Sequence, residues 1–409
     1  MSFSNNFPTT NPTLELDFAN VGALDPRITF TRSSIATVTN SLGLIQTVGA
    51  NVPRFDYDPV TLAAKGLLIE EQRTNLLTYS EQFDNAAWSK IFCTITANST
   101  TAPDGSTNAD TFVESVDSVA QGHYVYQSPT LTASQAYTIS CYAKPIASNR
   151  LFRLTITDSA STTIALTTFN LTTGTIFSTS VGTASITPVG NGWYRLTATG
   201  TVGASGSGLL VFASKSLSNL DYIGDGSSVA FLWGAQLEAG SFATSYIPAV
   251  ASQVTRSADV ASMTGTAFSS WYNQNEGTLY AEFDAFADSG SYFIASISDG
   301  TNNNRMQLLP WSSRQGQIVT GGVDQALFDN GTLSINTTTK VAIAYAANNS
   351  ALSLSGASPA TDNTVTVPSV DRLLFGNATS GANPNNGHIR KVAYYPVRLS
   401  STQLQAITS

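Results

Sequence analysis

The feature of this chain that most restricts its fold is a set of short stretches in which apolar and polar residues alternate. Residues 137–141 (YTISC) and 152–157 (FRLTIT) both show the pattern. Because neighbouring side chains of a β-strand point to opposite faces of the sheet, such stretches bury one face and expose the other. Similar stretches recur at roughly 8–14-residue spacing between residues 76 and 250, separated by turn signals. This arrangement predicts an antiparallel β-sandwich.

The small share of charged residues supports the same fold class. Charged residues make up 11% of the chain, against about 25% in an average globular protein. Exposed helices need Glu, Lys and Arg, whereas Thr suits strands, and Ser, Asn and Gly suit turns. With 42% hydrophobic residues the chain has enough apolar surface to bury a core. We therefore expect an all-β protein.

At 409 residues the chain is too long for a single core, which indicates several domains. Residues 1–75 contain short strand-like runs, but Gly and Pro interrupt them too often for an independent core. We expect this segment to pack against a partner protein or against the next domain. We expect residues 76–250 to form a first sandwich and residues 266–409 to form a second one. Residues 251–265 lack the alternation and are expected to be a linker. A short helix, capped by Ser400, closes the second sandwich.

Charge and hydropathy exclude several classes of function. A net charge of −8 and no basic patch argue against nucleic-acid binding and against docking on anionic lipid. No stretch is apolar enough to be inserted in a membrane. The first residues lack the basic and apolar regions of a secretory signal, so we expect synthesis in a cytoplasm. Cys93 and Cys141 fit this compartment as small core residues, with a disulfide between them as the alternative.

Six motifs lie close together near the beginning of the chain. They are 24–32 (LDPRITFTR), 43–47 (GLIQT), 53–59 (PRFDYDP), 66–77 (GLLIEEQRTNLL), 79–83 (YSEQF) and 87–88 (AW). These motifs resemble the head spike fibre domain proteins of tailed bacteriophages and prophages. The resemblance implies a virion component that usually forms homotrimers.

Motifs further along the chain resemble sugar-binding sandwiches. Residues 192–196 (GWYRL), 233–238 (WGAQLE) and 244–248 (TSYIP) are similar to carbohydrate-binding-module-like jelly rolls of phage tails and glycanases. Residues 277–279 (GTL) and 387–396 (GHIRKVAYYP) resemble a laminin-G or concanavalin-A-like sandwich. The expected architecture is thus two antiparallel sandwiches behind an N-terminal segment.

The residue types of common catalytic sites are scarce. His123 and His388 have no metal-binding neighbours in sequence, and His123 lies in an alternating strand, where a hydrogen-bonded structural role is expected. Asp-rich turns at 104–110 and 299–303 offer oxygen ligands for calcium, but Asp-Gly and Asn form turns by themselves. We expect no bound metal and no other cofactor.

One acid pair deserves comparison with glycosidases. Glu282 and Asp284 lie two residues apart on an expected strand, so both carboxylates project from the same face. Laminarinase-type enzymes of the concanavalin-like fold carry a third acid further along the strand. Here Phe286 and Ala287 occupy the positions where that acid is expected, and Asp288 comes one place late. We expect solvated strand acids and no catalysis.

Sugar binding requires an exposed aromatic ring beside polar groups. Trp88, Trp193 and Trp233 belong to the motifs above and are expected to pack inside. Trp311 follows a proline and precedes polar residues, so we expect it, with Arg314, to form a sugar platform. Trp271 and Tyr272 are the second candidate pair.

Three functions follow from these expectations. The first is a capsid-attached fibre or decoration subunit on the virion surface, in which residues 1–75 dock to other phage proteins and the sandwiches aid adhesion to host-surface glycans. Deleting residues 1–75 should then leave soluble sandwiches. The second is a tail fibre that recognises host polysaccharide, and the third is a polysaccharide hydrolase. The apolar docking residues expected in the first segment are Phe3, Phe7, Leu14, Leu16 and Phe18.

Overall fold

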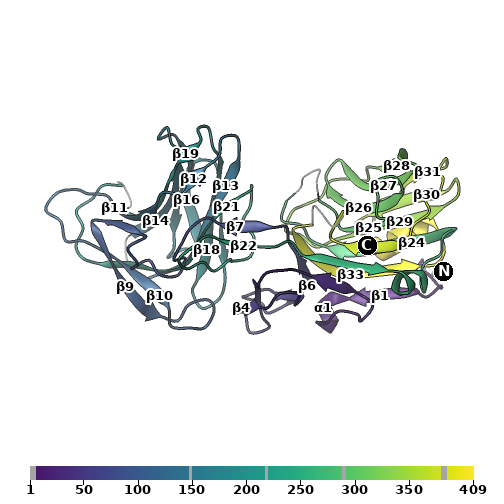
Figure 1. The fold of residues 1–409 in the computed structure, drawn as a ribbon, viewed down its shortest axis with the longest axis horizontal. Helices are drawn as coiled ribbons and strands as arrows, with labels where there is room; N and C mark the ends of the chain where they lie inside the picture. Colours follow the sequence, from purple (N-terminus) through teal and green to yellow (C-terminus); the bar gives the residue numbers. More distant parts are fainter. Residues whose placement is uncertain (1–5, 147–149, 217–219, 288–291, 379–384) are drawn as a thin grey trace, which may run out of the picture.

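The computed structural model describes residues 6–146, 150–216, 220–287, 292–378 and 385–409. It is an all-β protein with two lobes, as the sequence predicts (Figure 1). The strand pairs are antiparallel, and the helices of the described residues are short: α1 (Phe18–Val21), α2 (Thr266–Ser269) and α3 (Ser401–Thr408). Among these residues, no helix has the length and apolar character needed to cross a membrane.

The first sandwich contains two six-stranded sheets. One has the order β17 (Thr183–Pro188), β18 (Tyr194–Thr201), β13 (Ala136–Pro145), β21 (Ser228–Ala239), β10 (Ala109–Glu114), β9 (Cys93–Thr100). The other has the order β16 (Thr175–Val181), β15 (Thr163–Asn170), β14 (Arg150–Thr157), β20 (Leu209–Ser216), β11 (His123–Gln127), β8 (Ser89–Ile91). A small ladder joins β12 (Thr130–Leu131) to β19 (Gly206–Ser207).

The alternation seen in the sequence builds the core of this sandwich. Phe152, Leu154 and Ile156 of β14 are fully buried and pack with the inward residues of the facing sheet. Cys93 and Cys141 are both buried and unpaired, as expected.

The second sandwich is assembled from both ends of the chain. Its first sheet has the order β31 (Ala360–Asp362), β30 (Ser350–Leu354), β29 (Thr339–Ala346), β24 (Glu276–Phe283), β33 (Gly387–Tyr395), β6 (Ala64–Ile69), β5 (Arg54–Tyr57), and β1 (Leu14–Asp17) also pairs with β33. Its second sheet has the order β2 (Thr29–Thr31), β23 (Val260–Thr264), β32 (Arg372–Phe375), β25 (Ala295–Ser298), β26 (Arg305–Trp311), β27 (Arg314–Thr320), β28 (Val323–Phe328).

This topology corrects two expectations about domain boundaries. The second sandwich does not begin at residue 266, because strands from residues 1–75 complete both of its sheets. Residues 251–265 are not an irregular linker, since they contain β22 (Val254–Arg256) and β23. β22 pairs with β7 (Arg73–Asn75) in the narrow region between the lobes (Figure 1). Alternation is hard to recognise in strands of three to five residues, and this explains the error.

The short helix at the end of the chain forms as predicted. The Ser400 hydroxyl accepts a hydrogen bond from the Gln403 amide, and the Gln403 side chain accepts one from the Ser400 amide, which is a complete capping box. Leu404 is fully buried in a small apolar cluster on the outer face of the first sheet of the second sandwich, and Ile407 packs against this cluster.

Candidate functional site

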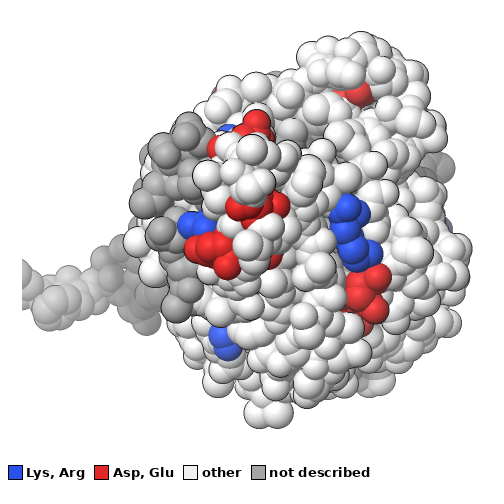
Figure 2. Space-filling model, turned by 90° about the vertical axis from the view of Figure 1, so that its left-hand side faces the viewer, with Lys and Arg blue, Asp and Glu red and all other residues white. Residues whose placement is uncertain are grey.

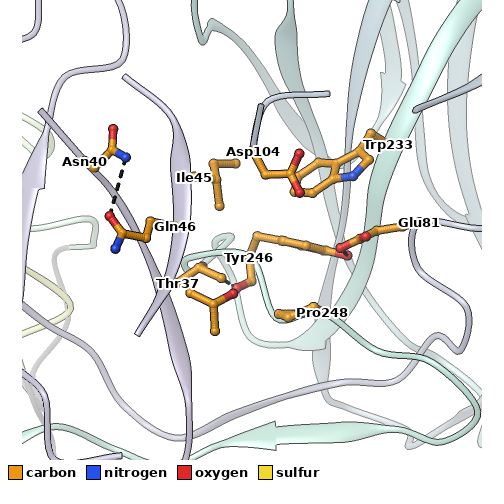
Figure 3. A pocket seen from close by; sticks show the side chains of 10 residues that line it. Thr37, Asn40, Ile45, Gln46, Glu81, Asp104, Trp233, Tyr246 and Pro248 are labelled. Carbon is orange, nitrogen blue, oxygen red and sulfur yellow. Dashed lines mark hydrogen bonds between the residues drawn. The ribbon is translucent and has the colours of Figure 1, made fainter. Parts of the chain in front are cut away.

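A polar cavity of about 300 Å³ lies where an N-terminal hairpin meets the first sandwich (Figure 3). The hairpin consists of β3 (Ala36–Thr39) and β4 (Ile45–Val48). It supplies Thr37, Asn40, Ile45, Gln46 and Thr47 to the wall, and the first sandwich with its following loop supplies Glu81, Asp104, Trp233, Tyr246 and Pro248. Its volume falls at the lower end of the range of about 300–1,000 Å³ that is usual for ligand sites.

Hydrogen bonds fix the hairpin against the sandwich. The Ile45 amide donates to the Pro103 carbonyl at 3.0 Å, and the Thr37 hydroxyl donates to the Tyr246 carbonyl at 2.5 Å. Gly105 packs against Leu44, since a Cβ at Gly105 would lie 3.2 Å from Leu44 Cδ1. The cavity is therefore a fixed feature of two parts of the chain that are distant in sequence.

The floor of the cavity carries a carboxylate held by two donors. The Tyr246 hydroxyl donates to Glu81 Oε1 at 3.0 Å, and the Asn108 amide donates to Glu81 Oε2 at 2.9 Å. Burial raises the pKa of Glu81, the hydrogen bond from Tyr246 opposes this effect, and the charge of Asp104 adds to it. Glu81 is thus an oriented acceptor next to a second carboxylate, Asp104.

The aromatic wall consists of Trp233 and Tyr246, whose ring centroids are 4.6 Å apart. Both rings are almost fully buried, which confirms the expected packing role of Trp233. The Trp233 Nε1–H has no hydrogen-bond partner among the described residues. Buried donors without a protein partner are rare, and they mark places where water or a ligand supplies the acceptor.

A buried network of charged residues lies behind the hairpin. Arg54 forms salt bridges with Glu70 (2.6 Å) and with Asp259, Arg256 pairs with Glu70 (2.8 Å), and Arg32 pairs with Asp259 (3.0 Å). The side chains of all five residues are fully buried.

This network joins the lobes and positions the cavity. Glu70 follows β6 of the second sandwich and accepts from the amide and hydroxyl of Ser245, which comes after the last strand of the first. Arg54 also donates to the Thr37 carbonyl of the hairpin at 3.1 Å. Burial alone would raise the pKa of Glu70, but the charges of Arg256 and Arg54 outweigh burial and lower it. The carboxylate therefore stays ionised inside the protein.

The first pair of residues predicted to bind sugar is partly exposed. The Trp311 indole donates to the Tyr292 carbonyl at 2.8 Å, and the Arg314 guanidinium lies 5.8 Å from the Trp311 ring centroid. Trp311 and Arg314 face each other across the β26–β27 turn, so the structure brings them together. Their role in sugar binding stays a prediction.

In the second predicted pair Trp271 is buried, whereas Tyr272 is partly buried. Trp271 is 4% exposed and packs against Phe268 and Tyr394. The Tyr272 ring stacks on Phe268 with centroids 4.6 Å apart and adjoins Tyr345. Both rings close one end of the second sandwich, because the turn after α2 directs them inward. The buried Trp271 ring cannot present a face to a sugar, and a role of Tyr272 in sugar binding stays a prediction.

The predicted docking residues have a different role. Leu14, Leu16 and Phe18 are 1%, 4% and 2% exposed and belong to the core of the second sandwich, so they are not available for docking to another protein. Leu14 and Leu16 lie on β1, which pairs with β33 near the other end of the sequence, and Phe18 begins α1 directly after it. Phe7 is exposed, and Phe3 lies outside the described residues.

The histidines and the acid pair take part in structural contacts. His123 is buried and its Nε2 lies 2.6 Å from Asp117, which agrees with the expected hydrogen-bonded role. His388 lies between Asp284 (2.9 Å) and Asp56 (2.9 Å). Glu282 pairs with Arg390 at 2.9 Å.

The Asp-rich segments form turns, as predicted. Asp104 accepts from the Ser106 amide and Asp299 accepts from the Thr301 amide, two residues further along in each case. Within the described ranges, no group of three or more His, Cys, Asp or Glu is placed to hold a metal ion.

Sequence reasoning did not identify Glu81, Asp104 and Tyr246 as partners in one cavity. Two of them lie in quoted motifs, 79–83 and 244–248, so the motifs were a usable signal. What they did not reveal is that the β3–β4 hairpin covers these residues.

No family model matches the sequence, and no curated protein matches it significantly. Partial similarity to solved structures is found. One is the CBM40 module of a Ruminococcus gnavus IT-sialidase bound to α2,3-sialyllactose, with 17% identity over 35% of this chain and 88% of that chain, and a TM-score of 0.32. Another is domain 4 of AbnA, a GH43 arabinanase from Geobacillus stearothermophilus, in complex with arabinotriose (10% identity, 41% and 82% coverage, TM-score 0.31).

A third is the NanB sialidase of Streptococcus pneumoniae, with 12% identity over 36% of this chain and a TM-score of 0.30. The similarity spans only 26% of the length of that enzyme. In all three cases it concerns a partial β-sandwich likeness and no more.

Proposed function

We propose that this chain is a non-catalytic, glycan-binding protein on the surface of a tailed-bacteriophage particle. The observation that carries the glycan-binding part is the composition of the cavity. It combines two carboxylates, two side-chain amides and two threonine hydroxyls with the apolar, partly exposed Ile45 and Pro248 in a fixed space. Sugars need this combination, because their hydroxyls require many oriented partners and their C–H faces require an apolar surface.

The cavity also has an opening suited to a chain end or a branch. Gln46 and Thr47 are exposed at its rim, whereas Glu81 and Trp233 lie deeper. A neutral monosaccharide unit that enters past the hairpin can place its hydroxyls between Gln46 and Glu81.

The contacts of the acid pair support a binding role without catalysis. The Glu282 carboxylate is paired with Arg390, and the Asp284 carboxylate is paired with His388. The positive charge of His388 lowers the pKa of Asp284 against the opposing effect of burial. A general acid needs a raised pKa, so this environment favours a structural role.

The phage part of the proposal rests on the sequence resemblance at residues 24–90. Several motif residues, among them Arg54 and Glu70, lie in the buried network that joins the lobes. In this proposal the motif specifies the junction of two sandwiches and the adjoining cavity. We propose attachment to the head, as the resemblance implies, and assembly as a homotrimer.

A glycan array followed by calorimetric titration tests the binding proposal. The full chain should bind a neutral oligosaccharide, and the double variant Gln46→Ala/Glu81→Gln should bind it at least about tenfold more weakly, because two hydrogen bonds to the ligand are lost. Ser180→Ala, on exposed β16, is the matched control and should not change the affinity. Equal affinity of the double variant and the wild type would contradict the proposed site.

Antibody labelling of intact phage particles tests the location. Labelling on the head supports the proposal, and labelling on the tail supports a tail fibre. Particles without label would contradict a virion role altogether. The solution mass of the purified chain tests the homotrimer.

A further inference from the structure

The outer face of one sheet in the first sandwich carries a second cluster of aromatic and charged residues, separate from the cavity. Strands β11, β20 and β14 lie side by side in this sheet. Val125, Phe212 and Leu154 are paired across these three strands, are fully buried and belong to the core. Side chains alternate between the two faces of a sheet, so the neighbouring rows point outward.

Two tyrosines and an arginine lie in these outward rows. Tyr124 is opposite Ala213, and Ala213 is opposite Arg153, so all three point to the same side. In the next outward row Tyr126 is opposite Val211, which is opposite Thr155. Tyr124, Tyr126 and Arg153 are all half-buried.

The spacing of this surface suits a flat ligand. Neighbouring strands are about 4.8 Å apart, which places the backbones at Tyr124 and Arg153 about 10 Å apart, with the small side chain of Ala213 between them. The Tyr124 and Tyr126 ring centroids are 6.0 Å apart. Ala213 itself is buried, so a pyranose ring would lie against the exposed parts of Tyr124 and Tyr126, with a substituent at Arg153.

Arg153 carries a charge without an acidic partner. Its Nε donates to the Thr168 hydroxyl at 3.2 Å, which orients the guanidinium, and among the described residues it forms no salt bridge. Burial lowers the pKa of Arg153, and no neighbouring carboxylate opposes this effect. By contrast, Arg150 at the start of the same strand pairs with Glu114 at 2.6 Å. A half-buried guanidinium gains most from an anion that can accept two hydrogen bonds.

We propose that this outer sheet face is a second glycan site that binds an acidic saccharide, with the ligand carboxylate on Arg153 and a sugar ring on Tyr124 and Tyr126. A guanidinium without an acidic partner beside two adjacent rings suits a saccharide that carries a carboxylate. The whole chain has a net charge of −8, so acidic polysaccharides are repelled unless a local cation receives them. Figure 2 shows few charged side chains on the end of the first sandwich, and several of them are acidic.

One further polar group of this surface can meet a sugar hydroxyl. Thr155 lies beside Arg153 on β14 and is partly exposed, whereas Thr168, opposite Arg153 on β15, is fully buried and serves to orient Arg153. The site needs no residue of the cavity, and no residue of the cavity lies on these strands. The two sites can therefore be removed one at a time.

The test uses the full chain and a matched pair of probes. One probe is an oligosaccharide of alternating glucuronic acid and N-acetylglucosamine, and the other is the same oligosaccharide with its carboxyl groups reduced to alcohols. The wild type should bind the acidic probe about tenfold or more tightly than the reduced one, since a charge-assisted hydrogen bond is lost on reduction. This preference should weaken as salt is added.

Three variants locate the binding. Arg153→Gln should abolish the preference for the acidic probe, whereas Tyr126→Ala should weaken binding of both probes by a similar factor. Arg305→Gln, a half-buried arginine of the second sandwich that also bonds a neutral side chain, is the control and should change nothing. Each variant should show wild-type thermal unfolding, which separates loss of binding from loss of fold.

The outcomes separate this proposal from the first one. If Arg153→Gln keeps the preference, or the wild type binds both probes equally, the acidic site is absent even when neutral glycans still bind in the cavity. If Gln46→Ala/Glu81→Gln removes binding of the acidic probe, the cavity binds it and the sheet-face proposal is overturned. If the cavity proposal fails but Arg153→Gln removes the preference, the sheet-face site stands alone.

Discussion

The two sandwiches of this protein differ in how their strands are drawn from the sequence. The first takes the strands of both its six-stranded sheets from residues 89–239, in one continuous stretch. The second combines strands between Leu14 and Ile69 with strands between Val260 and Tyr395. The comparison teaches that a continuous domain can be delimited from its sequence, whereas a domain closed by distant strands cannot. It also shows that the N-terminal segment is part of the second sandwich and covers the first.

The largest difference between the two sandwiches should appear when each is produced as a separate fragment. Fragment 76–250 contains both sheets of the first sandwich and should fold alone. Fragment 266–409 lacks β1, β2, β5, β6 and β23, so its apolar faces are left uncovered and it should aggregate or remain unfolded. Circular dichroism and thermal unfolding of the two purified fragments measure the difference.

The same reasoning overturns the expectation that deleting residues 1–75 leaves two soluble sandwiches. That deletion should yield a folded first sandwich attached to an unfolded second one. If the deleted protein shows full strand content and two cooperative transitions, the contrast between the two sandwiches is smaller than the topology indicates.

The next largest loss of stability should come from a substitution in the buried charged network that joins the two lobes. Glu70→Gln removes a fully buried carboxylate from between Arg54 and Arg256 and leaves buried positive charge without compensation. We expect a loss of about 3–5 kcal/mol in the free energy of unfolding, measured by urea titration. Glu15→Gln, which breaks the exposed pair with Lys391, is the control and should cost less than about 1 kcal/mol. Equal losses in the two variants would contradict the importance of the junction.

A pH experiment sharpens the contrast within the second sandwich. Burial alone would lower the pKa of His388, but the charge and hydrogen bond of Asp284 and the hydrogen bond of Asp56 raise it to about 9, from an ordinary value of 6.5. The folded protein holds this proton more tightly than the unfolded chain does. The stabilisation is therefore complete below pH 6.5 and disappears as the pH rises through about 9.

The difference between the folded and unfolded pKa values of His388 corresponds to roughly 3 kcal/mol in the free energy of unfolding. The wild type should lose this stabilisation between pH 6.5 and 9.5. His388→Asn should be less stable at pH 6.5 and should lack this decline. Urea titrations at the two pH values measure both quantities, and a decline of the same size in the variant would show that another group causes it.

The smallest effect should come from the terminal helix. Ser400→Ala removes the hydroxyl that caps the Gln403 amide and should cost about 1 kcal/mol. Because Leu404 is fully buried, the helix should remain docked. Hydrogen exchange of the α3 amides should become faster, while the amides of β13 in the first sandwich should not change.

Much of the fold could be predicted, but little of the cavity could. Buried alternation at Phe152, Leu154 and Ile156, unpaired Cys141 and the capped helix after Ser400 all follow from local rules. The cavity depends on the hairpin around Asn40 and on residues 81 and 246, which are brought together only by folding. Trp271 shows the opposite failure, because an aromatic residue beside polar ones has the same local pattern whether it faces solvent or the core.

The sequence alone determined the fold class, since the period of two and the scarcity of charge leave strands as the only way to bury enough apolar surface. It also determined that the chain contains more than one core. Only the tertiary structure decided that Leu14 pairs beside Tyr394 and that Arg54, Glu70 and Asp259 meet in one buried network. The physical reason is that antiparallel pairing depends on register and on the shape of the opposing face, and neither is written in the spacing of residues along the chain.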